Sequence, residues 1–158
     1  MKQLQDIADF VRGLRTQMRF GELSRAPLQL LRLQLQGETA EYDWMARPPD
    51  PWDATLPRRV GDRNASLQAL LDAMALREML FCVLPGIRSA ELRAFRQSAS
   101  GPPRVVIAGT VTREAPALLR VPSPAMRAKL CGFHFYLDDG VLRPQYSEDH
   151  GLELMTGE

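Results

Sequence analysis

The stretch Asn64–Leu84 constrains the fold of this chain more than any other part of the sequence. Apolar side chains cover most of its helical circumference, and its polar side chains gather near one stripe: Gln68, Asp72, Arg77 and Glu78. A surface helix has one apolar face, whereas a helix that is apolar nearly all round is buried. The sequence therefore predicts a central buried helix at about residues 65–84, capped by Asn64 or Ser66.

The first half of the chain predicts a helix followed by a hairpin. Apolar residues recur every three or four positions over about residues 2–20, which is typical of an amphipathic helix. Leu31, Leu33 and Leu35 then alternate with polar residues, and a turn near Gln36–Glu38 leads into a second alternating run. One face of that second strand carries Ala40, Tyr42, Trp44 and Ala46.

The second half predicts further strands and one short helix. An amphipathic strand at Ala90–Ala94 precedes an interior strand at Arg104–Arg113, where Gly109 marks a bulge or a close approach. A helix at about Pro124–Cys131 has Ser123 as its N-cap and proline at its first position. A strand from Phe133 to Leu137 then meets the hairpin signal Asp138-Asp139-Gly140 and returns through Val141 and Leu142.

Together these patterns predict an α+β fold. An antiparallel sheet of five or six strands packs on the buried helix, with the N-terminal helix alongside. A chain of 158 residues fits one domain, which we place at residues 1–146. Residues 147–158 form an acidic tail that we expect to be frayed.

Composition argues against several classes of partner. The net charge of +1 gives no general attraction to nucleic acid or membrane, and the arginines are spread along the chain. The sequence has no long uncharged apolar stretch and no apolar N-terminal leader. Two unclustered cysteines favour a reducing compartment, so we expect a soluble cytoplasmic protein, with Cys82 as a small core residue.

Residues 47–63, between the second strand and the central helix, show neither the helical nor the strand periodicity of apolar residues. Four prolines there, Pro48, Pro49, Pro51 and Pro57, argue against both helix and central strand. A long connection without regular structure is usually functional or disordered. Trp52 argues against disorder, because disordered segments tend to lack aromatic residues.

This region supplies the candidate binding residues. Aromatic residues, arginines and carboxylates gather around it, and such residues are typical of interface hot spots. The candidates are Tyr42, Asp43, Trp44, Arg47, Asp50, Trp52, Asp53 and Arg63. We expect a non-enzymatic binding or accessory protein that contacts a protein partner or a second copy through Tyr42–Arg63. The plainer interpretation is that both tryptophans seal the core while the arginines pair with the aspartates.

The alternative is a small enzyme or ligand-binding protein with a pocket between the sheet and residues 47–63. Asp43, Asp50 or His134 would then do acid–base work. The sequence has no glycine-rich phosphate loop, no nucleophile elbow and no Cys-x-x-Cys. His134 and His150 show no metal-ligand spacing, so we expect neither a cofactor nor a metal. His134 is expected to point away from the core.

Overall fold

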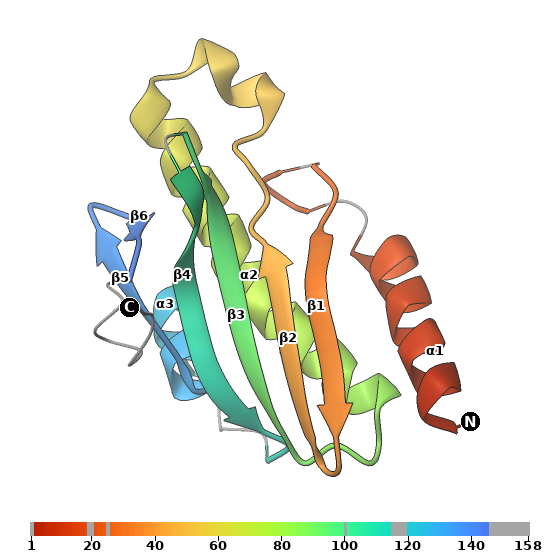
Figure 1. Ribbon diagram of the computed structural model, residues 1–158. Coiled ribbons are helices and arrows are strands. Elements are labelled where there is room, and N and C mark those ends of the chain that lie inside the picture. The colour runs from red at the N-terminus through yellow and green to blue at the C-terminus, as the bar shows by residue number, and fades with distance from the viewer. Residues whose placement is uncertain (1, 19–20, 25, 100, 115–119, 146–158) are drawn as a thin grey trace.

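The computed structural model describes residues 2–18, 21–24, 26–99, 101–114 and 120–145 (Figure 1). Its helices are α1 (Lys2–Gln17), the short 3-10 helix η1 (Pro51–Thr55), α2 (Arg58–Val83) and α3 (Pro124–Leu130). Its strands are β1 (Gln29–Gln36), β2 (Thr39–Met45), β3 (Ser89–Ser98), β4 (Gly101–Thr112), β5 (Phe133–Asp138) and β6 (Val141–Arg143). The predicted acidic tail and residues 19–20 of the predicted first helix lie outside the described residues.

The six strands form one sheet in chain order, which confirms the α+β class. Every neighbouring pair is antiparallel except β2 and β3, which run parallel. Strands joined in parallel need a long crossover connection, and here α2 provides it. The sheet is therefore mixed, where the sequence had predicted an antiparallel one.

Helix α2 packs along one face of the sheet and lies behind it in Figure 1. Leu70, Leu76 and Leu80 are buried in the core, as the sequence predicts. The exposed side of α2 is a narrow stripe at three- and four-residue spacing that carries Ala75, Glu78 and Cys82. The prediction that Cys82 is a core residue is therefore wrong.

Helix α2 begins six residues before the predicted cap at Asn64, at Arg58, with Pro57 as its N-cap. The four prolines prevent an α-helix only up to Pro57. A proline restricts the conformation of the residue before it, but it is tolerated at the start of a helix. Arg58 and Asp62 then lie one helical turn apart in the first turns of the helix, with 4.0 Å between Nε and Oδ2. The prediction that residues 47–63 lack regular structure is thus wrong for η1 and for the start of α2.

The hairpin of β1 and β2 forms as predicted, and Gly37 takes a positive φ of 61° in its turn. Ala40, Tyr42, Trp44 and Ala46 all lie in the core. The predicted alternation in β1 fails at Leu31, which is 42% exposed. The cause is a register shift: between Leu30 and Arg32, β1 has one residue more than β2. Such a bulge interrupts the regular alternation of side chains between the two faces of the sheet.

The second half of the chain also follows the predicted pattern. Ser123 caps α3, and β5 and β6 form a hairpin whose turn places Asp139 and Gly140 at positive φ. A Cβ atom on Gly109 would lie 2.4 Å from the carbonyl oxygen of Gly132, so β4 and the start of β5 approach closely there. His134 is exposed, as expected. Among the described residues, no helix combines the length and apolar character needed to cross a membrane.

Candidate functional site

Residues 47–57 connect β2 to α2 and lie at one end of the molecule, which is the top in Figure 1. We call this segment the strap. It contains the four prolines and the single turn of η1. Each of its ends is held by hydrogen bonds to other parts of the chain, and these bonds determine what the strap exposes.

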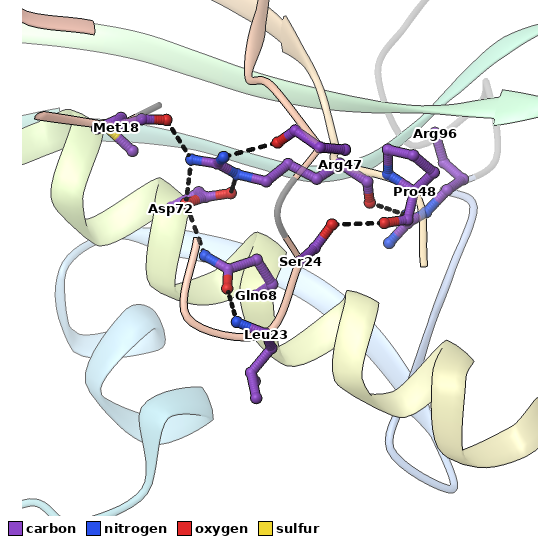
Figure 2. Close-up of polar contacts among 9 residues, drawn as sticks. Met18, Leu23, Ser24, Arg47, Pro48, Gln68, Asp72 and Arg96 are labelled. Atoms are coloured by element: carbon purple, nitrogen blue, oxygen red, sulfur yellow. Dashed lines mark hydrogen bonds and ion pairs between the residues drawn. The ribbon is translucent and has the colours of Figure 1, made fainter. Parts of the chain in front are cut away.

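Arg47, the first strap residue, is buried in the interior (Figure 2). Its Nε atom donates to Oδ2 of Asp72 on α2 at 2.8 Å. Its Nη1 and Nη2 atoms donate to the backbone oxygens of Ala26 and Met18, at 2.8 and 2.7 Å. One guanidinium therefore joins the strap, the end of α1, the segment before β1 and the middle of α2.

Gln68 extends this network along α2 (Figure 2). Its Nε2 atom donates to Oδ1 of Asp72 at 2.9 Å, and its Oε1 atom accepts from the amide of Leu23 at 2.6 Å. Burial raises the pKa of Asp72, and the hydrogen bond from Arg47 opposes that rise. A buried charge without its partner is costly, so the ion pair fixes the position of Arg47 closely.

Two more hydrogen bonds hold the start of the strap. The hydroxyl of Ser24 donates to the backbone oxygen of Pro48 at 2.7 Å, and Nη1 of Arg96 on β3 donates to the backbone oxygen of Arg47 at 2.9 Å (Figure 2). Burial lowers the pKa of Arg96, while the charge of Asp62 raises it. The first two strap residues are therefore attached to the sheet as well as to the helices.

The middle of the strap is held by its own short helix. The carboxylate of Asp50 accepts from the amide of Trp52 at 3.0 Å, which makes Asp50 the N-cap of η1. The amide of Leu56 donates to the backbone oxygen of Asp53 at 3.0 Å, and Asn64 of α2 donates to the Asp53 carboxylate at 3.3 Å. Within this hydrogen-bonded segment the Trp52 side chain is 76% exposed and Leu56 is 44% exposed.

The eight residues predicted as a contact surface fall into separate environments. Tyr42, Trp44, Arg47 and Asp50 are buried, Asp53 is half-buried, and Trp52 and Arg63 are exposed. Tyr42 contacts Phe10 edge to face and lies beside Trp44, with ring centroids 5.4 and 5.7 Å apart. Trp44 therefore seals the core, whereas Trp52 faces solvent.

Asp43, the remaining candidate, lies on the sheet face opposite α2. Arg93 of β3 holds its carboxylate with two hydrogen bonds, at 3.0 and 2.7 Å, and Arg32 of β1 lies 3.7 Å away. Cross-strand pairs of opposite charge stabilise a sheet. Asp43 therefore has a structural role in joining three strands, and it is separate from the strap.

The three acid–base candidates are not brought together. The strand register places Asp43 opposite Arg93, Arg93 opposite Ala108, and Ala108 opposite His134. Three strand spacings of about 4.8 Å separate Asp43 from His134 by roughly 14 Å, too far for proton transfer between them. The carboxylate of Asp50 is engaged as the cap of η1.

A charged cleft of about 410 Å³ lies beside the start of α2. It is lined by Arg58, Arg59, Asp62, Asp138, Asp139, Val141 and Arg143. Nη2 of Arg59 and Nη2 of Arg63 lie 2.9 and 2.6 Å from the carboxylate oxygens of Asp139. Arg59 of the cleft and the neighbouring Arg63 therefore pair with Asp139 of the turn between β5 and β6, and not with an aspartate of residues 47–63.

Sequence reasoning missed Asp72, Gln68 and Leu56. The first two were visible as polar positions on a helix that is otherwise apolar, which is a sign of a buried polar network. Leu56 had no such signal, because a single apolar residue among prolines is common on a protein surface. In the described part of the chain, no group of three or more histidine, cysteine, aspartate or glutamate residues is placed to hold a metal ion. The chain matches no protein-family model, no curated protein and no solved structure.

Proposed function

We propose that this chain is a protein-binding module whose contact surface is the strap, with Trp52 and Leu56 as its apolar anchors. The exposure of Trp52 carries the proposal. About three quarters of this large side chain faces solvent, although its amide donates to Asp50 and the neighbouring Asp53 accepts from Asn64 of α2. Tryptophan is enriched among the residues that dominate interface energies. A tryptophan buries 150–250 Å² when it is covered, so a partner gains most from this residue.

The construction of the strap supports the same proposal. Binding costs free energy when a loop must be ordered, and a loop that is already rigid avoids that cost. Four prolines, the Asp50 cap and the buried Arg47 restrict the strap before any partner arrives. The residues proposed to make contact are therefore Trp52 and Leu56, and the buried residues around them are positioning residues.

The surroundings of the strap suggest the chemistry of the partner. The side chains of Arg58 and Arg59 follow directly after Pro57 and are 95% and 68% exposed. Interfaces commonly have an apolar centre and a polar rim. The matching surface would be an apolar pocket with carboxylates at its border, on another protein or on a second copy of this chain.

The test replaces Trp52 with a photo-crosslinking phenylalanine derivative and identifies the protein that is joined to it in cells. The control carries the same derivative at Met126 of α3, which is 52% exposed and lies away from the strap. The affinity of the identified partner is then measured for Trp52→Ala, Leu56→Ala and Met126→Ala. We expect a loss of about 30-fold or more for Trp52→Ala, the level of an interface hot spot.

Equal crosslinking at both positions, or the same affinity for Trp52→Ala and Met126→Ala, would count against the proposal. Sedimentation of the purified protein separates the two kinds of partner. If the partner is a second copy, the sedimentation coefficient rises with concentration and Trp52→Ala abolishes the rise.

A second candidate function is binding of a small ionic ligand in the charged cleft beside α2. The observation that favours it is the set of exposed ion pairs there, because exposed pairs contribute little to stability and are readily exchanged. Inorganic phosphate and acetate are suitable first probes, with the melting temperature as readout. Arg59→Ala should remove any shift that phosphate causes, and no shift with either ion would exclude this use of the cleft.

A further inference from the structure

Strand β1 is the outermost strand of the sheet and pairs only with β2 among the described strands. An edge strand presents backbone groups that another chain can pair with, and proteins usually protect such edges with charges or prolines. The strand reads QLLRLQLQ and contains no proline or lysine. Its single charge, Arg32, is engaged by Glu41 and Asp43 of β2. Ionic protection is therefore weak along this edge.

An apolar groove runs beside the first half of β1. Its volume is about 670 Å³, within the range of pockets that hold a ligand. It is lined by Val11, Leu14, Arg15 and Met18 of the first helical region and by Pro27, Leu28, Gln29 and Leu30 at the start of β1. Figure 1 shows α1 beside β1, and the edge-to-face contact of Phe10 with Tyr42 of β2 places the helix against the buried face of the sheet at this edge.

Arg15 is the only charged side chain among the eight that line this groove. It makes no ion pair with the described residues, whereas Arg12, one turn earlier, lies 2.8 Å from Asp9. A charge at an apolar border interacts more strongly with an opposite charge than it would in water. The groove therefore complements a ligand that is apolar along its length and carries a carboxylate.

We propose that a partner protein adds an extended segment as a further strand along residues 28–32. Its apolar side chains would fill the groove, and a carboxylate beside them would pair with Arg15. In this mode of recognition, backbone hydrogen bonds provide affinity and side-chain pockets provide specificity. The surface is separate from the strap, so the inference stands or falls independently of the function proposed above.

The test uses a capped synthetic peptide that has threonine at every second position. The positions between the threonines carry leucine, leucine and glutamate, in that order. Its counterpart has lysine in place of glutamate. Calorimetry should give an affinity at least about tenfold higher for the glutamate peptide, because Arg15 attracts the glutamate and repels the lysine; this ratio corresponds to about 1.4 kcal/mol. Arg15→Glu should reverse this preference. Arg12→Glu is the control, because Arg12 is exposed on the same helix but does not line the groove. It should change the ratio of the two affinities by no more than about twofold.

Hydrogen exchange provides the second readout. Addition of a strand should slow exchange of amides within residues 28–32, because those that point outward gain a partner. Binding that does not change exchange there would overturn strand addition. Failure of both peptides to bind would overturn the proposal as a whole.

A second copy of the chain is the competing occupant. If Arg15→Glu changes the dissociation constant of a dimer in sedimentation equilibrium, with no effect on the peptide, the groove belongs to that dimer and the proposal is wrong. Because Arg15 is exposed, its substitution should leave the melting temperature close to that of the wild type. Trp52→Ala should bind the peptide normally, which separates this result from the test of the strap.

Discussion

Arg47 and Asp72 form an ion pair that solvent barely reaches: the Nε–Oδ2 distance is 2.8 Å and the side chains are 1% and 4% exposed. They come from different elements, the strap and the middle of α2. Moving two charges out of water is unfavourable, and the loss is recovered only when the remaining donors and acceptors are bound. Here the backbone oxygens of Met18 and Ala26 take those donors, so the pair attaches the strap to the core.

The first prediction concerns the stability of this pair. Arg47→Met should lower the free energy of unfolding by about 3–5 kcal/mol, because Asp72 is left buried without its partner. Combining it with Asp72→Leu should recover much of the loss, since no buried charge remains. Urea unfolding measures both variants, and Arg32→Met is the matched control because exposed pairs contribute about 1 kcal/mol or less. A loss no larger than that of the control would contradict the account.

The second prediction concerns pH. Burial raises the pKa of Asp72 above its ordinary value of 3.8, so the folded state binds this proton more tightly than the unfolded state. The resulting stability is present below pH 3.8 and is lost as the pH rises through the folded pKa. The wild type should therefore lose stability relative to Asp72→Asn across that window.

Two measurements check the direction. One is urea unfolding of both proteins over a pH series, and the other is an NMR titration of the Asp72 carboxyl carbon. The opposite result would be a wild type that gains stability relative to Asp72→Asn as the pH rises, with the Asp72 titration midpoint below 3.8. It would show that the effect of Arg47 on the pKa of Asp72 outweighs the effect of burial.

The third prediction distinguishes the two cysteines. Cys82 lies on the exposed stripe of α2, whereas Cys131 is buried and burial raises its pKa. A higher pKa means less thiolate at pH 8, and the thiolate is the reactive form. In the folded protein iodoacetamide should modify Cys82 first, as followed by mass spectrometry. Rapid modification of folded Cys82→Ser would contradict the placement of Cys131.

The fourth prediction uses the opposite environments of the two tryptophans. Trp44 is fully buried and Trp52 is 76% exposed. Trp52→Phe should leave a blue-shifted emission that acrylamide hardly quenches, because the remaining indole lies in the core. In the wild type about half of the emission should be open to quenching. A Trp52→Phe variant that is quenched as strongly as the wild type would place Trp44 at the surface.

The parts of the fold that the sequence predicted correctly are those where a local pattern reports burial. The alternation from Ala40 to Ala46 predicted the buried face of β2, and the Asp-Gly signal at Asp139-Gly140 predicted the last hairpin. The start of α2 was missed because Arg58–Arg63 lacks an apolar period and follows four prolines. The parallel pairing of β2 with β3 was missed because the direction of β3 depends on the end of the sheet to which the long α2 crossover returns the chain, and no local pattern reports that.

For the candidate site, the sequence pointed to a segment but not to the environment of its residues, and its use as a contact surface stays a prediction. The prolines and Trp52 marked the strap, since both are local features of the sequence. Burial of Arg47 could not be predicted, because its partner Asp72 is 25 residues away and an arginine near a loop is normally exposed. The buried polar stripe of α2 was visible, but its partners arise from tertiary packing alone.

The central claim is that the strap holds Trp52 in a fixed, solvent-facing position before any partner binds. Backbone order parameters from ¹⁵N relaxation test it most directly, at the amides of Trp52, Asp53 and Leu56. We predict values of about 0.85, equal to those of β2 and β3, with a fall in Arg47→Met. Values below about 0.6 at these amides in the wild type would show a flexible strap and contradict the account.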